Sequence, residues 1–247
     1  MDKVLFVQAC EKIIHKDKIR NGIGTLSEKT LHAVLKNYFE PDESYHEVKV
    51  NSFVADIVRG NEIIEIQTRS FDKLRNKLEN FLPNYHVTVV YPIAATKWLY
   101  WIDPETGEIS SKRKSPKKGT PYEAFRELYK IKSYLLHPNL SICIIMIDME
   151  EYRYLNGWSS DRKKGSSRCD RIPIDVVEEV CLDRPEDYEK LLPEGLQVDF
   201  TSKDYKKQSK LTLSHAQTAL NVLYYAGVVK RTGKTSNLYL YERIGTE

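Results

Sequence analysis

Residues 45–68 read YHEVKVNSFVADIVRGNEIIEIQT, and this stretch decides the fold of the N-terminal half. Three short runs within it are rich in β-branched and aromatic residues, which is typical of strands. The runs are Tyr45–Val50, Phe53–Arg59 and Glu62–Thr68. Asn51-Ser52 and Gly60-Asn61 join them, and both links are short enough for hairpin turns. The sequence therefore predicts an antiparallel meander of three strands.

Helical patterns lie on both sides of the meander. Apolar residues recur at three- and four-residue spacing from Thr25 to Phe39, which predicts a helix. A second helix is predicted from Phe71 to Leu82, before Pro83, and His86–Tyr91 has the composition of a further buried strand. The order helix, three strands, helix, strand predicts an α/β fold.

The middle of the chain is predicted to hold three more elements. They are a hairpin of Trp98–Asp103 with Glu108–Ser110, a helix over Tyr122–Leu136 and a buried strand over Ile142–Asp148. The polar and basic stretch Asn156–Asp170 is predicted to be a loop.

The C-terminal region is predicted to form a separate domain with its own core. Residues 191–195 read LLPEG, so a boundary is predicted there, between a domain of residues 1–195 and one of residues 196–247. The second domain is predicted to contain two helices, the second ending at Gly227, and a hairpin. These elements are a basic helix over Ser202–Ser209, a helix opened by the capping box Ser214-His215-Ala216-Gln217, and the strands Val228–Arg231 and Leu238–Glu242.

The composition excludes several classes of protein. Hydrophobic residues make up 41% and charged residues 30% of the 247 residues, which favours a packed globule over a disordered chain. No window approaches the roughly 18 consecutive apolar residues of a membrane span, and the first residues lack the layout of a signal peptide. The four cysteines form no CxxC pair, as expected in a reducing cytosol. We therefore expect a cytoplasmic protein without a membrane partner.

The positive charge is clustered in four blocks, although the net charge is only +3. Any single block could be a solvated loop or helix face. Four blocks in one near-neutral chain favour a polyanionic partner, DNA first, with RNA not excluded. The blocks are Lys112–Lys118, Arg162–Arg168, Lys203–Lys210 and Lys230–Lys234.

An acidic pair is predicted on the hairpin around Gly60-Asn61. If Arg59 faces Glu62, residues whose numbers sum to 121 lie opposite each other, which places Asp56 across from Glu65. Gln67, two residues along, would project on the same face. Like charges opposed in a sheet are destabilising, and a bound cation such as Mg²⁺, which prefers carboxylate oxygens, would offset the repulsion.

A third acid, Glu28, shares the apolar stripe of the first predicted helix and would face the sheet. Each acid has another interpretation. Thr25–Glu28 is also a capping box, and Asp56 and Glu65 could be exposed residues of an edge strand. A one-residue bulge near the turn would also break the predicted register.

The acids and the order of elements together resemble the restriction-endonuclease-like PD-(D/E)XK superfamily over Gly24–Tyr91, roughly a quarter of the chain. Its first-helix acid would be Glu28, its hairpin aspartate Asp56 and its E-x-K element Glu65-Ile66-Gln67. The resemblance implies an α-βββ-α-β core that hydrolyses DNA phosphodiester bonds with Mg²⁺ or Mn²⁺. Asp56, Glu65, the Ile66 carbonyl and Glu28 would hold the metal.

Gln67 stands where this superfamily usually has a lysine that positions the attacking water. An amide can orient water by hydrogen bonds but brings no charge. The alternative is therefore a catalytically inactive nuclease fold that acts as a DNA-binding regulator.

Residues 196–247 resemble a winged helix-turn-helix domain, which implies DNA binding. His215, Thr218 and Asn221 would face the bases from the second helix. Basic side chains of the first helix and the wing would contact phosphates; these are Lys206, Lys207, Lys210, Arg231 and Lys234. The alternative is a protein-interaction or dimerisation domain, so a homodimer stays open.

Overall fold

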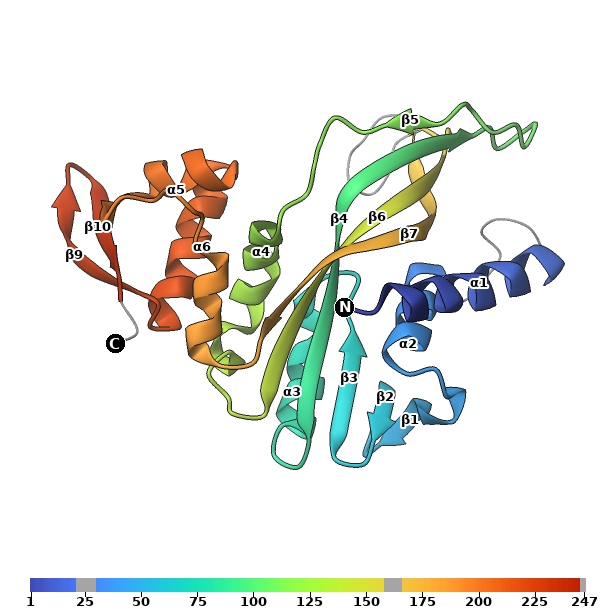
Figure 1. Ribbon diagram of the computed structural model, residues 1–247, viewed down its shortest axis with the longest axis horizontal. Helices are drawn as coiled ribbons and strands as arrows, with labels where there is room; N and C mark the ends of the chain where they lie inside the picture. The colour runs from blue at the N-terminus through green and yellow to red at the C-terminus, as the bar shows by residue number, and fades with distance from the viewer. Residues whose placement is uncertain (21–29, 158–165, 245–247) are drawn as a thin grey trace. The chain divides into compact units, whose positions relative to one another are not determined.

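The computed structural model describes residues 1–20, 30–157 and 166–244, without the side chains of 15–20 (Figure 1). The chain divides into two compact units. The first comprises Met1–His46, Ala94–Gly119 and Ile145–Glu179, and the second comprises Glu47–Ile93, Thr120–Ile144 and Val180–Glu247. None of the helices in the described residues is long and apolar enough to cross a membrane.

A mixed sheet of seven strands combines with helices, so the predicted α/β class is confirmed. The strand order is β1-β2-β3-β4-β6-β7, and β5 pairs with β4. β3 and β4 are parallel, whereas β2 and β3 are antiparallel. The strands are β1 His46–Val50, β2 Phe53–Arg59, β3 Glu62–Ile66, β4 His86–Ile102, β5 Arg113–Lys114, β6 Leu140–Tyr154 and β7 Ser167–Leu182.

The predicted meander is confirmed in the second unit. β2 has the predicted bounds, while β1 begins one residue later than expected, because Glu43–Tyr45 forms the 3-10 turn η1. The predicted helix after β3 is a 3-10 turn, η2 (Phe71–Leu74), followed by α3 (Arg75–Phe81). Phe71, Leu74, Leu78 and Phe81 are buried, so their three- and four-residue spacing packs this segment onto the core.

In the first unit, α1 (Lys3–Arg20) and α2 (Thr30–Phe39) are joined by aromatic and polar contacts. Phe6 of α1 packs edge-on against Tyr38 of α2, and the Tyr38 hydroxyl donates to Glu179 of β7. The described part of α2 agrees with the predicted helix. The capping box Thr25–Glu28, and with it Glu28, lies outside the described residues.

β4 contains the first strand of the hairpin predicted in the middle of the chain. It runs without interruption from His86 through Pro92 to Ile102, so this strand is continuous with the strand predicted over His86–Tyr91. The hairpin itself forms: Ile102 bridges Ile109, the Asp103 N–H donates to the Glu108 carbonyl, and the Ser110 N–H donates to the Trp101 carbonyl. Trp98 and Leu99 pair with Lys114 and Arg113, a strand that was not predicted.

The helix predicted over Tyr122–Leu136 is broken into short pieces. It consists of η3 (Pro121–Ala124), α4 (Phe125–Leu128) and η4 (Tyr129–Tyr134), and Ile131 has a non-helical backbone at φ −113° and ψ 22°. Burial of Phe125, Leu128 and Ile131 fixes this segment despite the break.

β7 was not predicted, and its first residues, Ser167–Asp170, fall in the stretch predicted to be a loop. Pro173 lies within the strand, and proline cannot donate a hydrogen bond to a neighbouring strand. The sheet tolerates it because β7 is the edge strand of the order.

The C-terminal segment forms a three-stranded sheet of order β8-β10-β9 with two helices. Its elements are β8 Asp199–Phe200, α5 Ser202–Ser209, α6 Leu213–Tyr225, β9 Val229–Thr235 and β10 Leu238–Arg243. The bounds of α5 and the end of α6 before Gly227 agree with the prediction. The C-terminal hairpin of β9 and β10 has longer strands and a shorter turn than predicted, since only Ser236-Asn237 separates its strands.

The predicted capping box at Ser214 is wrong. Thr212 is the N-cap of α6, and its hydroxyl accepts the main-chain N–H of His215. Ser214 lies inside the first turn, where its carbonyl accepts the Thr218 hydroxyl. Threonine is also a preferred N-cap residue, and the helix begins after Thr212, two residues before Ser214.

The C-terminal helices share a core with residues 120–144. Tyr205 of α5 is fully buried, packs edge-on against Phe125 of α4 and donates to the Leu191 carbonyl. Lys132 of η4 donates to the side chain of Asn221 on α6. These contacts contradict the expected independent core of residues 196–247.

Candidate functional site

The hairpin around Gly60-Asn61 has the predicted register. Ile57 pairs with Ile64, Val58 with Ile63 and Arg59 with Glu62. At the next position the strands are linked through a side chain, because Asp56 Oδ2 accepts the main-chain N–H of Ile66 at 2.7 Å. Asp56 is thus fixed beside the Glu65-Ile66 peptide, as the sequence predicted.

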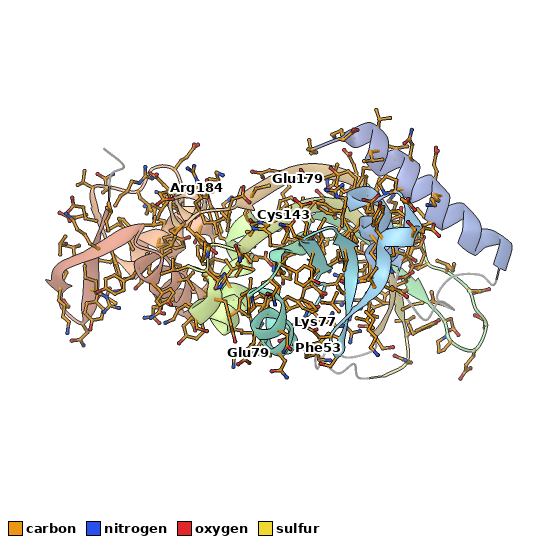
Figure 2. All side chains as sticks on the ribbon, turned by 90° about the horizontal axis from the view of Figure 1, so that it is seen from below. Phe53, Lys77, Glu79, Cys143, Glu179 and Arg184 are labelled. Carbon is orange, nitrogen blue, oxygen red and sulfur yellow. The ribbon has the colours of Figure 1, made fainter. Side chains whose placement is uncertain are left out.

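Glu65 is the most constrained acid of this hairpin. It is 3% exposed, and both of its carboxylate oxygens accept from Lys77 Nζ, at 2.7 and 3.0 Å. Lys77 comes from α3 and lies near the sheet (Figure 2). Asp56, Glu65 and Lys77 form a cluster that we call the hairpin site.

Lys77 was missed by the sequence analysis, although a signal was present. The buried stripe of η2 and α3 contains Leu74, Leu78 and Phe81. Lys77 follows Leu74 by three residues and precedes Phe81 by four, so it belongs to the same stripe. A lysine within an apolar stripe must either extend to solvent or find a buried anion, and here the anion is Glu65.

The carboxyl of Glu65 is perturbed by its surroundings. Burial, followed by the neighbouring charge of Asp56, raises the pKa of Glu65 from 4.5 to about 7, while Lys77 acts in the opposite direction. The ionised form of Glu65 is therefore disfavoured, and a cation added beside it would stabilise that form.

The side-chain amide of Gln67 is hydrogen-bonded outside the hairpin site. Its Nε2 donates to the Ser70 carbonyl at 2.8 Å, just before η2, and its main-chain N–H donates to Val90 of β4. Its side chain therefore braces the turn between β3 and η2.

The structure describes three of the four residues that were predicted to bind a metal ion. Within residues 1–20, 30–157 and 166–244, no group of three or more His, Cys, Asp and Glu side chains could hold a metal ion. Asp56, Glu65 and Ile66 lie together, whereas the fourth predicted ligand, Glu28, is outside these ranges.

The residues predicted to read bases on α6 have intramolecular partners. The Asn221 side chain accepts from Lys132 Nζ at 2.9 Å, and the Thr218 hydroxyl donates to the Ser214 carbonyl. His215 is half-buried in the first turn of the helix.

The residues predicted to contact phosphates are exposed and fall into two groups. Lys206 and Lys207 lie in the last turn of α5, and Lys210 follows them with a left-handed backbone at φ 59°. Arg231 and Lys234 of β9 lie over tyrosine rings: the Arg231 guanidinium is 4.0 Å from the centre of the Tyr239 ring.

Comparisons with known proteins identify relatives without a described activity. The chain is 35% identical over 147 residues to an uncharacterized protein of Treponema pallidum (strain Nichols). That alignment covers 59% of this chain and 56% of the relative, so the chain spans about half the length of the protein it matches. No solved structure matches significantly.

A family described as a domain of unknown function, DUF8091, matches residues 29–183. The matched residues include the whole hairpin site and end before the C-terminal helices α5 and α6. Because the match covers more than half of the chain, the protein belongs to the DUF8091 family.

Proposed function

We propose that this protein is a divalent-metal-dependent endonuclease that hydrolyses DNA phosphodiester bonds at the hairpin site. The observation that carries the proposal is the buried carboxyl of Glu65 beside Asp56: burial and the charge of Asp56 raise the pKa of Glu65 to about 7. Strongly perturbed acids with a defined charge partner are concentrated at functional sites. The resemblance of Asp56 and Glu65-Ile66-Gln67 to PD-(D/E)XK nucleases gives the class of reaction.

The donors at the hairpin site suit a hard divalent cation. Asp56 and Glu65 supply carboxylate oxygens, which Mg²⁺ and Mn²⁺ prefer. The N–H and C=O of one strand residue project to the same side, so the Ile66 carbonyl is directed toward β2 like its N–H. Asp56, Glu65 and this carbonyl would hold the ion, and Glu28 is the proposed fourth ligand. Bound there, the ion would lower the pKa of the attacking water and neutralise the phosphate.

Lys77 supplies the positive charge that Gln67 lacks. Its ammonium group is held at Glu65, and Gln67 is committed to the Ser70 carbonyl. In the proposed reaction the Lys77 ammonium orients the attacking water and stabilises the charge that develops on the phosphate. Gln67 then positions the turn that precedes α3.

A second candidate function is a DNA-binding regulator with an inactive nuclease fold. The direct ion pair between Lys77 and Glu65 favours it, because the pair partly neutralises the acid without any metal. The two functions make different predictions for cleavage.

The test is nicking of supercoiled plasmid by the purified full chain, with MgCl₂ or MnCl₂ against EDTA. We expect cleavage only with metal, and a loss of about a hundredfold or more in Asp56→Ala, Glu65→Gln and Lys77→Met, as for removal of one transition-state contact. Gln67→Ala should retain more activity than Lys77→Met. Glu79→Gln, at an exposed position on α3, is the matched control and should cleave normally.

Metal binding gives a second measurement that separates the two candidate functions. Isothermal titration with Mn²⁺ should show binding at pH 8 that Asp56→Ala abolishes. Metal binding without cleavage would favour the regulator. Cleavage that persists in the Asp56→Ala, Glu65→Gln double variant would contradict the proposed site.

A further inference from the structure

The wing and the end of α6 present tyrosines interleaved with cations. The Arg231 guanidinium lies 4.5 Å from the ring centre of Tyr224 and 4.0 Å from that of Tyr239, so it contacts both rings. Lys234 Nζ lies 4.9 Å from the centre of the Tyr239 ring. We call Tyr224, Arg231, Lys234 and Tyr239 the tyrosine–arginine face.

This face is open although its rings already have partners. Tyr224 is 46% exposed and Tyr239 is 41% exposed. Tyr225, the residue after Tyr224, belongs to a second group of tyrosines and a cation. Lys132 lies over the rings of Tyr225 and Tyr129, which are also exposed. Exposed aromatic residues at this density mark an interaction surface rather than scattered surface residues.

The charge of the face determines what it fits. The wing from Val229 to Arg243 carries four cations and one acid, Glu242, which pairs with Lys230. Asp199 of the neighbouring β8 is close enough to accept from the Thr232 hydroxyl. Positive charge therefore exceeds negative charge around the tyrosine rings. A partner with flat rings and repeated negative charges complements both the rings and the charge.

We propose that the tyrosine–arginine face binds single-stranded nucleic acid. Unpaired bases stack on the exposed rings of Tyr224 and Tyr239, and the phosphates lie beside the cations Arg231 and Lys234. A base that stacks on Tyr239 displaces the flexible Lys234 ammonium toward the backbone. Duplex bases cannot stack in this way, because their faces are covered by neighbouring base pairs.

The contacts of α6 agree with this mode of binding better than with reading of duplex DNA. The Asn221 side-chain oxygen accepts from Lys132 and the Thr218 hydroxyl donates within the helix, so both would have to exchange these bonds to contact base edges. The proposal does not depend on the proposed cleavage reaction, because the face shares no residue with the hairpin site and needs no metal.

The experiment is fluorescence anisotropy of the full chain in EDTA with labelled dT₂₀, rU₂₀ and a 20-base-pair duplex. We expect at least one single strand to bind about tenfold or more tightly than the duplex, and the dT₂₀ and rU₂₀ arms tell DNA from RNA. Tyr224→Ala and Tyr239→Ala should each weaken that binding by about tenfold, the effect of one lost stacking contact.

Tyr224→Phe and Tyr239→Phe are the matched controls, because each keeps the ring, and they should bind like the unsubstituted chain. Arg231→Ala should weaken binding and flatten its dependence on salt. Equal affinity for duplex and single strands would overturn the proposal, and this comparison needs no variant. Equal binding by the Ala and Phe variants would overturn it as well.

Discussion

Two buried glutamates, one in each unit, differ in how their charge is compensated. Glu151 of β6 is 1% exposed and contacts three cations: Arg153 at 2.6 Å, Lys97 at 3.2 Å and Arg168 at 3.5 Å. Burial disfavours its ionised form, but these cations outweigh burial and hold its pKa below the usual value. Glu65 is almost as buried, yet its pKa is raised to about 7.

This difference in charge compensation distinguishes the structural ion cluster at Glu151 from the candidate functional site at Glu65. Glu151 is ionised and saturated by its own neighbours, so it needs nothing from solution. Glu65 has Lys77 as its cation within the hairpin site but also faces Asp56. The ionised form of Glu65, which burial and Asp56 disfavour, would gain from a bound cation, which is why we propose a functional site at Glu65 and not at Glu151.

The largest expected effect is at Glu151. Glu151→Gln leaves three cations around a neutral amide, and breaking a buried ion cluster in this way should lower the free energy of unfolding by about 3–5 kcal/mol. Urea denaturation at pH 7 measures it. Exposed Glu79→Gln should change stability by less than about 0.5 kcal/mol. A comparably small effect at Glu151 would show that the cluster is not a structural element.

The next effect is the pH dependence contributed by Glu65. Between pH 4.5 and about 7 the folded protein keeps a proton on Glu65 that the unfolded chain releases. The free energy of unfolding therefore falls as pH rises through this window, by about 3 kcal/mol in total. Glu65→Gln should remove this slope in urea denaturation measured from pH 4.5 to 8.

Glu151 should contribute the opposite slope. Its folded pKa is lowered, so its stabilisation is present above the unfolded value of 4.5 and is lost as pH falls below it. If Glu65→Gln keeps the wild-type profile between pH 4.5 and 7, the pKa of Glu65 is not raised in the folded protein.

The smallest of the three effects is at Lys77. Lys77→Met leaves ionised Glu65 without its ammonium partner, and should destabilise the fold by about 1–3 kcal/mol at pH 8. At pH 5, where Glu65 is protonated, the loss should be much smaller. In a Glu65→Gln background the effect at pH 8 should shrink, which a double-mutant cycle measures. Lys73→Met, at an exposed position on η2, is the control. Equal losses at both pH values would mean that Lys77 acts through packing alone.

Part of the hairpin site could be predicted from residues that are close together in the sequence. The Gly60-Asn61 turn and the alternation of residues in β2 and β3 fix the register, so the approach of Asp56 to Glu65 followed from the sequence. The place of Lys77 in the stripe of Leu74 and Phe81 is also local. Its partner was not predictable, because that depends on how α3 packs on the sheet.

Longer-range packing decided the elements that were predicted wrongly. β7 has a proline that argues against a strand, and it forms because it lies at the edge of the sheet, beside β6. The predicted independence of residues 196–247 failed because Tyr205 finds its aromatic neighbours in residues 120–144, which no local pattern indicates.

The sequence by itself determined the α/β class, the meander with its register, and the candidate acids Asp56 and Glu65, because turn chemistry and side-chain alternation act over a few residues. Only the tertiary structure decided that Glu65 is buried against Lys77, that the Gln67 amide donates to the Ser70 carbonyl, and that Arg231 contacts the rings of Tyr224 and Tyr239. Burial and charge compensation depend on segments far apart in the chain. They set the pKa of an acid and the exposure of a ring, and these are the properties from which function is inferred here.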